Sequence, residues 1–131
     1  MSWENFTYDE FACQCGCGKN EMVNTVIDDL QALRTECGFP FIISSGYRCP
    51  DHPIEKSKSA PGPHSTGLAV DIALSHKEAL AVFSGAVMTN LEEDEWVWKG
   101  FGVNQKGTNR FIHLDQCHES AKRPRPHLWS Y

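Results

Sequence analysis

An almost uninterrupted apolar stretch near the middle of the chain limits most strongly how this protein can fold. The stretch, residues 68–74, reads LAVDIAL and contains a single charged residue, Asp71. Because side chains alternate between the two faces of a strand, Asp71 shares one face with alanines, while the larger aliphatic side chains occupy the other. Burying a carboxylate is costly unless a cation or a hydrogen-bond donor pairs with it. The pattern predicts a strand with one core face and one face that presents Asp71 to a partner.

A second stretch, NRFIHLDQC, has the same two-faced pattern. It places Phe111, His113 and Asp115 on one face and two aliphatic residues on the other. A further histidine, His64, stands in a glycine- and proline-rich segment seven residues before Asp71. Two imidazoles and one carboxylate are typical of a catalytic zinc site, which keeps its fourth position open for water. We therefore expect His64, Asp71 and His113 to bind Zn²⁺.

Two helices are expected to cover the core faces of these strands. Residues 22–37 carry an apolar stripe at helical spacing, and Gly38 follows as a stop signal. Ser75 and Glu78 have the spacing of a capping box, which predicts a second helix over residues 76–89.

The remaining segments predict short strands and loops. Residues 39–45 read as a short strand, whereas residues 50–63, with four prolines, read as a long loop. The acidic run at 91–95 is expected to be a solvated turn, and residues 96–104 a strand or an irregular crossing. The tail, residues 123–131, lacks a helical pattern, and its aromatic side chains are expected to anchor it. Two main helices and four or five strands predict an α+β fold with a small, mainly antiparallel sheet.

Length and charge limit the classes of function. The 131 residues suit one domain, 1–131, and a monomer is expected. A net charge of −5 without a basic stripe argues against nucleic acid as a partner. The apolar stretches are too short for membrane insertion. The N-terminal MSWENFTYDEF lacks the basic start and apolar run of a secretory signal, so synthesis in the cytoplasm is expected.

Six cysteines are many for a chain of this size. Three stand in CQCGCG, and the full set is Cys13, Cys15, Cys17, Cys37, Cys49 and Cys117. C-x-C-x-C without a second cluster matches poorly the paired C-x-x-C spacing of structural zinc sites, although such a site stays an alternative. Disulfides are a further alternative outside the cytoplasm, and buried free thiols are the expected state during synthesis.

Three motifs, SSGYRCP, HSTGLAVDI and FIHLD, resemble the zinc-dependent D-alanyl-D-alanine carboxypeptidase family, which shares its fold with hedgehog signalling domains. FACQCGCG and RPRPHLWSY resemble its small single-domain branch, found in bacteriophages and bacteria. The resemblance implies that His64, Asp71 and His113 are zinc ligands and that Arg48 contacts the substrate and polarises its carbonyl. A planar guanidinium can grip a carbonyl oxygen or a carboxylate. The alternative for Arg48 is a surface position packed on Tyr47.

The general base of the family is missing at its usual positions. Relatives carry a carboxylate three residues before the last ligand or a histidine two residues before it, where this chain has Arg110 and Phe111. Asp115 is the nearest replacement as a catalytic base, and its alternative role is to orient a ligand. More distant candidates are Glu92, Glu93 and Glu95. Residues expected along the cleft are Ser45, Tyr47 and Ser65, and those expected at the surface are His52, His76, His118 and His127.

With this ligand pattern, the resemblance implies a zinc peptidase that hydrolyses amide bonds in peptidoglycan stem peptides. It would act as a D-Ala-D-Ala carboxypeptidase or as an endolysin-type endopeptidase, in the cell wall or periplasm or from a phage particle. One alternative is a catalytically silent zinc-binding module that recognises the cell wall, which the missing base favours. Another is a structural component of a phage particle.

Overall fold

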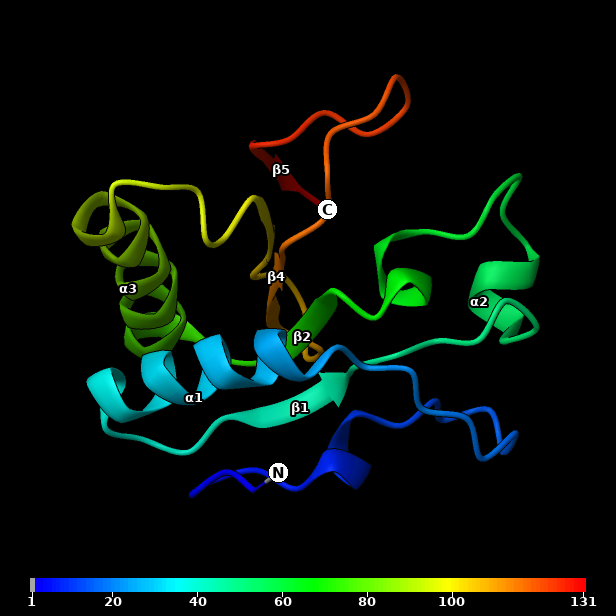
Figure 1. The fold of residues 1–131 in the computed structure, drawn as a ribbon, viewed down its shortest axis with the longest axis horizontal. Helices are drawn as coiled ribbons and strands as arrows, with labels where there is room; N and C mark the ends of the chain where they lie inside the picture. Colours follow the sequence, from blue (N-terminus) through cyan, green and yellow to red (C-terminus); the bar gives the residue numbers. More distant parts are fainter. Residues whose placement is uncertain (1) are drawn as a thin grey trace.

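The computed structural model describes residues 2–131 as an α+β fold built on one five-stranded sheet (Figure 1). The strand order is β1-β2-β4-β3-β5, and every pairing is antiparallel except that of β3 with β5. The strands are β1 (Ile42–Ser45), β2 (Ala69–Ala73), β3 (Gly100–Asn104), β4 (Phe111–Asp115) and β5 (His127–Ser130). The predicted fold class is confirmed.

Two helices pack against one face of this sheet. α1 (Asn24–Cys37) ends where Gly38 adopts the left-handed conformation, with φ of 78°, as its position predicted. α3 (His76–Glu93) runs four residues further than predicted, so the acidic run begins as its last turn. The predicted capping box is wrong, because the Ser75 side chain makes no capping hydrogen bond and the φ of His76 is +54°.

The hydrophobic core lies between the helices and the aliphatic face of the sheet. The central strands contribute Val70, Ile72, Ile112 and Leu114, all 2% exposed or less. α1 adds Val26, Ile27, Leu30 and Leu33, and α3 adds Ala79, Val82 and Ala86. The predicted division of both strands into a core face and a ligand face is therefore confirmed, and the opposite face of the sheet is left for the site.

The connecting segments contain short helices that the sequence pattern did not indicate. The proline-rich loop carries the single-turn α2 (Pro53–Lys56) and leads into the 3-10 helix η2 (Pro63–Thr66), and another 3-10 helix, η1 (Tyr8–Phe11), lies near the N-terminus. The tail returns to the sheet as β5 and extends its edge beside β3. None of the helices that the structure describes combines the length and apolar character that a bilayer crossing requires.

Candidate active site and metal centre

The register of the two central strands places Asp71 directly opposite His113. Residues opposite each other on antiparallel strands have their side chains on one face, so the carboxylate and the imidazole meet. His113 Nδ1 lies 2.9 Å from Asp71 Oδ1, and both side chains are buried. This pair forms the centre of the site.

His64 reaches the pair from η2. The helix ends at Gly67, whose φ of +77° lets the chain turn into β2 without the strain that a side chain would bring. His64 Nε2 lies 3.2 Å from Asp71 Oδ1. The potential ligand atoms of His64, Asp71 and His113, the residues expected to bind Zn²⁺, all lie within 4.8 Å of one another.

In both imidazoles, the ring nitrogen that is not directed at Asp71 lies next to a hydrogen-bond acceptor. His64 Nδ1 lies 2.8 Å from the Gly46 carbonyl oxygen, and His113 Nε2 lies 2.7 Å from Asp115 Oδ2. When each of these nitrogens donates, the other nitrogen of a neutral ring directs its lone pair at the Asp71 carboxylate. Two lone pairs and a carboxylate oxygen then converge without a proton between them, an arrangement that a bound cation would stabilise. The residues therefore fit a divalent metal.

The electrostatics of the site also favour a positive charge between the Asp71 carboxylate and the two imidazoles. Burial opposes the ionisation of Asp71, but hydrogen bonds from His113 and His64 outweigh it and lower the pKa of this carboxyl. Burial likewise opposes charge on His113, yet Asp115 and Asp71 outweigh it and raise the pKa of this imidazole. The same carboxylates that would hold a proton on His113 would stabilise a bound metal ion.

Arg48 lies beside the ligand set, facing a cleft. Its Nη2 is 3.7 Å from Asp71 Oδ2, and its Nη1 is 3.1 Å from Glu55 Oε2. Glu55 is fully buried in the single-turn α2 and also accepts hydrogen bonds from the Gly62 N–H at 2.7 Å and from Lys58 at 3.1 Å. The guanidinium is thus held in one orientation from behind, with 15% of the side chain exposed.

Asp115 lies behind His113. Besides accepting from His113 Nε2, its carboxylate receives a bidentate pair of bonds from Arg125, at 2.9 Å from Nε and 2.8 Å from Nη2. Burial opposes its ionisation, but His113 and Arg125 outweigh burial and lower the pKa of Asp115. The residue has no exposed surface and does not line the cleft, among the residues that the structure describes.

The cleft beside the ligand set has a volume of about 770 Å³. Its floor includes His64, Asp71 and His113, and the tail forms one wall. Trp129 of β5 packs on the His113 ring with centroids 5.1 Å apart, and the guanidinium of Arg125 lies 5.1 Å from the Trp129 ring. The expectation that aromatic residues anchor the tail is confirmed.

Several predicted positions differ from those in the structure. Ser45, Tyr47 and Ser65 do not line this cleft in the described part of the chain. Tyr47 is buried and donates a hydrogen bond to Glu21 instead. The acidic residues that were distant candidates for the base are exposed around the end of α3, away from the cleft: Glu92, Glu93 and Glu95.

The other histidines follow the surface prediction, with one addition. His76 and His118 are exposed, and His52 is half-buried and caps α2. His127 is exposed too, but it lines the cleft and stacks on Trp129 with centroids 5.6 Å apart. Its place on β5 could not be expected from a tail without a strand pattern.

Sequence reasoning also missed Glu55 and Arg125, the charged residues that hold Arg48 and Asp115. The available signal for Glu55 was a carboxylate close to two lysines in a loop of unusual length. The signal for Arg125 was its place between two prolines in RPRP, which restrict the backbone around it. Neither pattern specifies a partner.

Comparison with protein families agrees with this geometry. A family model described as Peptidase M15 matches residues 4–115, which include all three potential metal ligands and Arg48. The comparisons with curated proteins and with solved structures give no significant match. Because the family model spans most of the chain, the protein belongs to the peptidase M15 family, the zinc D-Ala-D-Ala carboxypeptidase family to which its motifs are similar.

Proposed function

We propose that the protein is a zinc-dependent peptidase that hydrolyses an amide bond in peptidoglycan stem peptides. The observation that carries the proposal is the ligand set of His64, Asp71 and His113, whose spare imidazole nitrogens are already held by acceptors at the floor of a cleft. Zinc held by these residues would supply a Lewis acid that polarises a carbonyl and activates water near neutral pH. The family supports a metallopeptidase of this kind.

Arg48 is proposed to bind the substrate next to this set. Its ion pair with the buried Glu55 fixes the guanidinium before substrate arrives, so little side-chain freedom is lost on binding. The remaining N–H groups can donate to the carbonyl oxygen on which negative charge develops, or to a terminal carboxylate.

Asp115 is proposed to position His113 rather than to transfer a proton. Its two oxygens are occupied by His113 Nε2 and by the Arg125 fork, and the carboxylate is closed off from the cleft. The proton acceptor is instead assigned to His127, a cleft-lining histidine outside the ligand set. Histidine is the side chain most often used for general acid–base catalysis.

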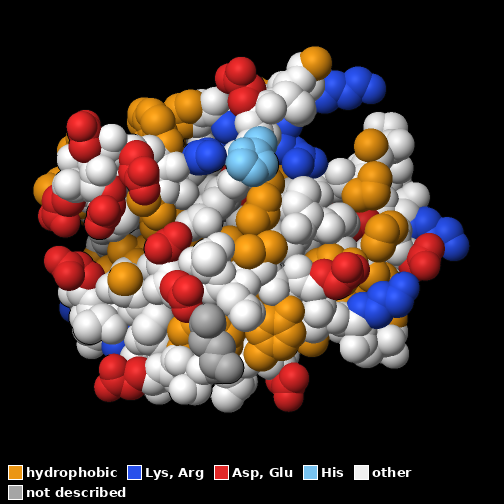
Figure 2. All heavy atoms as spheres, viewed as in Figure 1, with side chains coloured by type: hydrophobic (Ala, Val, Ile, Leu, Met, Phe, Trp, Pro, Cys, Tyr) orange, Lys and Arg blue, Asp and Glu red, His pale blue; other side chains and the backbone are white. Residues whose placement is uncertain are grey.

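The charge of the cleft supports a substrate that carries carboxylates. On a chain with net charge −5, the cleft concentrates positive charge: its lining contains Arg48, Lys58, Lys122, Arg123 and Arg125. Figure 2 shows Lys and Arg side chains gathered on both sides of a histidine near the top of the view, whereas acidic side chains cover the region over α3. Short peptides with free carboxylates, such as stem peptides, would be attracted to this cleft.

The test is to incubate zinc-loaded protein with purified muropeptides and to analyse the products by mass spectrometry. Release of a terminal D-alanine would identify a carboxypeptidase, and cleavage within the stem or a cross-link an endopeptidase. His127→Gln should slow turnover about a hundredfold with the metal retained. Binding of muropeptides without turnover would support the silent cell-wall-recognition module instead, and neither binding nor turnover would support a structural role.

A further inference from the structure

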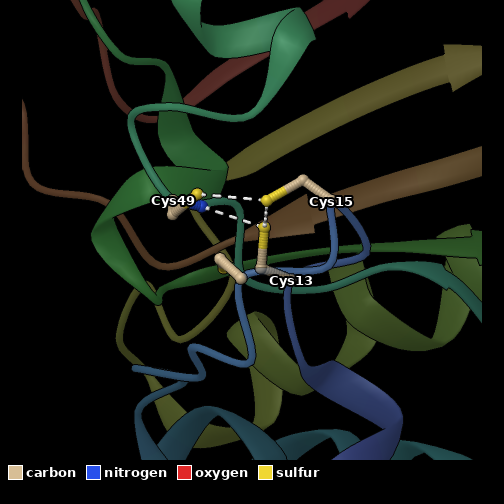
Figure 3. Close-up of side chains that lie close together, drawn as sticks. Cys13, Cys15 and Cys49 are labelled. Carbon is tan, nitrogen blue, oxygen red and sulfur yellow. Dashed lines mark hydrogen bonds between the residues drawn. The ribbon is translucent and has the colours of Figure 1, made fainter.

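Four of the six cysteines converge at one point on the side of the fold near the N-terminus. Cys13, Cys15 and Cys17 come from the loop after η1, and Cys49 comes from the segment that follows β1. Their four sulfur atoms all lie within 4.8 Å of one another. Figure 3 shows the side chains of Cys13, Cys15 and Cys49 directed toward one another from these separate segments. We propose that these four cysteines bind a second, structural zinc ion as thiolates.

The sulfur separations suit a metal site rather than disulfides. Cys15 Sγ lies 3.5 Å from Cys13 Sγ and 3.5 Å from Cys49 Sγ. A disulfide requires about 2.0 Å between its sulfur atoms. Zn–S bonds of about 2.3 Å in a tetrahedron place the sulfur atoms about 3.8 Å apart. Small side-chain movements therefore complete a tetrahedral Cys₄ site, whereas each disulfide would require its two sulfur atoms to approach by about 1.5 Å.

The backbone of the loop is shaped to bring all three of its cysteines to the same point. Gly16 and Gly18 have φ of +93° and +74° with no neighbouring atoms within contact of an added side chain. The left-handed backbone conformation, and not a lack of space, therefore explains why both positions are glycine. The Cys13 N–H donates to the Lys19 carbonyl at 3.0 Å and closes the loop around the cluster.

Two backbone N–H groups already point at sulfur atoms. The Cys49 N–H donates to Cys13 Sγ at 3.3 Å, and the Lys19 N–H donates to Cys17 Sγ at 3.3 Å. N–H bonds to ligand atoms orient them and stabilise their negative charge in metal sites. The cluster thus has four sulfur ligands and part of the supporting hydrogen bonding that a closed structural site requires.

The part of the loop that carries the three cysteines, residues 13–19, buries little of its own surface, because only Cys13 among these residues is buried. Within the described chain, residues 12–23 contain no helix or strand, and Cys13, Cys49 and Tyr47 form a small buried cluster separate from the main core. Bound zinc stabilises segments that cannot bury enough apolar surface, because its binding free energy is available only in the folded state. A metal cross-link between Cys49 and the loop would replace a hydrophobic core here.

The proposed ion would also stabilise the wall of the active site. Cys49 directly follows Arg48, and Gly46, whose carbonyl holds His64, lies three residues before Cys49. Residues 46–49 are also held next to the start of the cysteine loop, because the Phe11 carbonyl accepts a hydrogen bond from the Tyr47 N–H at 2.8 Å. A side chain at Gly46 would lie 2.6 Å from that same carbonyl oxygen, so the two segments are in close contact.

The experiment loads the fully reduced 131-residue chain with cobalt(II), whose thiolate complexes have an intense sulfur-to-cobalt charge-transfer absorption. Wild type should bind two cobalt ions per chain and show this absorption. Cys15→Ser/Cys17→Ser changes two exposed residues and should bind one ion without the charge-transfer band. Cys37→Ser, which removes a cysteine outside the cluster, should keep both ions and the band. His113→Ala should lose the other ion and keep the band.

Absence of the charge-transfer band in wild type would overturn the proposal without any variant. So would oxidation of these four cysteines to disulfides by dissolved oxygen, in place of metal binding, when zinc is offered to the reduced protein in air, seen as a mass loss of two hydrogen atoms per bond. Muropeptide turnover is a separate readout. A protein with the thiolate band but no turnover would count against the proposed peptidase alone, and turnover without the band would count against the second ion alone.

Discussion

The two clusters of potential metal ligands stand on different kinds of support. Asp71 and His113 lie on paired strands, and the hydrogen-bond partners of the histidine–aspartate cluster are protein groups that hold it without an ion. The cysteine cluster lies on a loop with two exposed members, Cys15 and Cys17, and its sulfur atoms have mainly each other as neighbours. The sheet therefore preorganises the histidine–aspartate cluster, whereas the proposed second ion would be needed to order the cysteine loop. Variants of each cluster test this difference.

Removing a ligand from the sheet should have the largest effect. His113→Ala deletes one of the three proposed metal ligands, so turnover of muropeptides should fall about a thousandfold or more. Zinc should be lost from this site, as measured by metal analysis together with circular dichroism to confirm the fold. His118→Ala, which changes an exposed histidine, is the control and should keep both metal and activity. Retention of zinc at wild-type affinity in His113→Ala would remove this residue from the ligand set.

Arg48 connects the two clusters, because it lies next to Cys49 and faces the sheet site. Arg48→Lys keeps the charge but loses the planar fork that Glu55 holds. Turnover should fall about ten- to a thousandfold with zinc content unchanged. Steady-state kinetics with metal analysis on the same samples measure both quantities. Unchanged turnover would show that the substrate does not use the guanidinium.

Asp115→Asn tests how the sheet holds its metal. The amide cannot form the charged bidentate pair with Arg125, so His113 should be oriented less firmly and zinc affinity should fall about ten- to a hundredfold. Excess zinc should then restore turnover. A rate that stays about a hundredfold low at saturating zinc would instead indicate that Asp115 transfers the proton.

Glu55→Gln tests the charge that holds Arg48, through the pH dependence of stability. Burial opposes the ionisation of Glu55, but bonds from Gly62, Lys58 and Arg48 outweigh it and lower its pKa to about 2. Its ionised form therefore stabilises the fold fully above the ordinary glutamate pKa of about 4.3, and this contribution is lost as the pH falls towards 2. At pH 7 the variant should be about 2–3 kcal/mol less stable than wild type.

Denaturant unfolding of both proteins between pH 7 and pH 2 measures this difference. It should shrink steadily below about pH 4.3 and vanish near the lowered pKa. A difference that does not change with pH would mean that the loss comes from packing rather than from the carboxylate charge.

Removal of metal should affect the loop more than the sheet. Lys19 lies within the cysteine loop, and trypsin cleavage after it should become about tenfold faster or more when a chelator removes the proposed ion. Cleavage after Lys77, at the start of α3, should change much less and serves as the internal control. Equal protection of Lys19 with and without metal would show that the loop is ordered by its protein contacts alone.

The predictability of these two clusters differs for the same physical reason. The side-chain period of a strand is two, so the alternation around Asp71 and His113 was enough to place both on one face, and the antiparallel register then brought them together. Arg125 and Glu55 come from segments without periodicity, and only the folded path of the tail and of the proline-rich loop gives them their partners. Convergence of Cys49 with the CQCGCG loop depends on two left-handed glycines and on a segment more than thirty residues away.

β3 carries two glycines, and the site depends on their lack of side chains. Moving the site to another protein would therefore require moving this strand with it. Gly100 and Gly102 lie opposite Asp115 and His113 in the register. A methyl group at Gly100 would collide with the Asp115 carboxylate, and one at Gly102 would lie 2.9 Å from the Trp129 indole. Grafting the ligand residues onto another sheet would therefore also require a G-x-G strand beside the H-x-D strand. Without side chains at these two glycines, the Asp115 carboxylate has room beside Gly100, and the Trp129 indole reaches across β3 to the His113 ring.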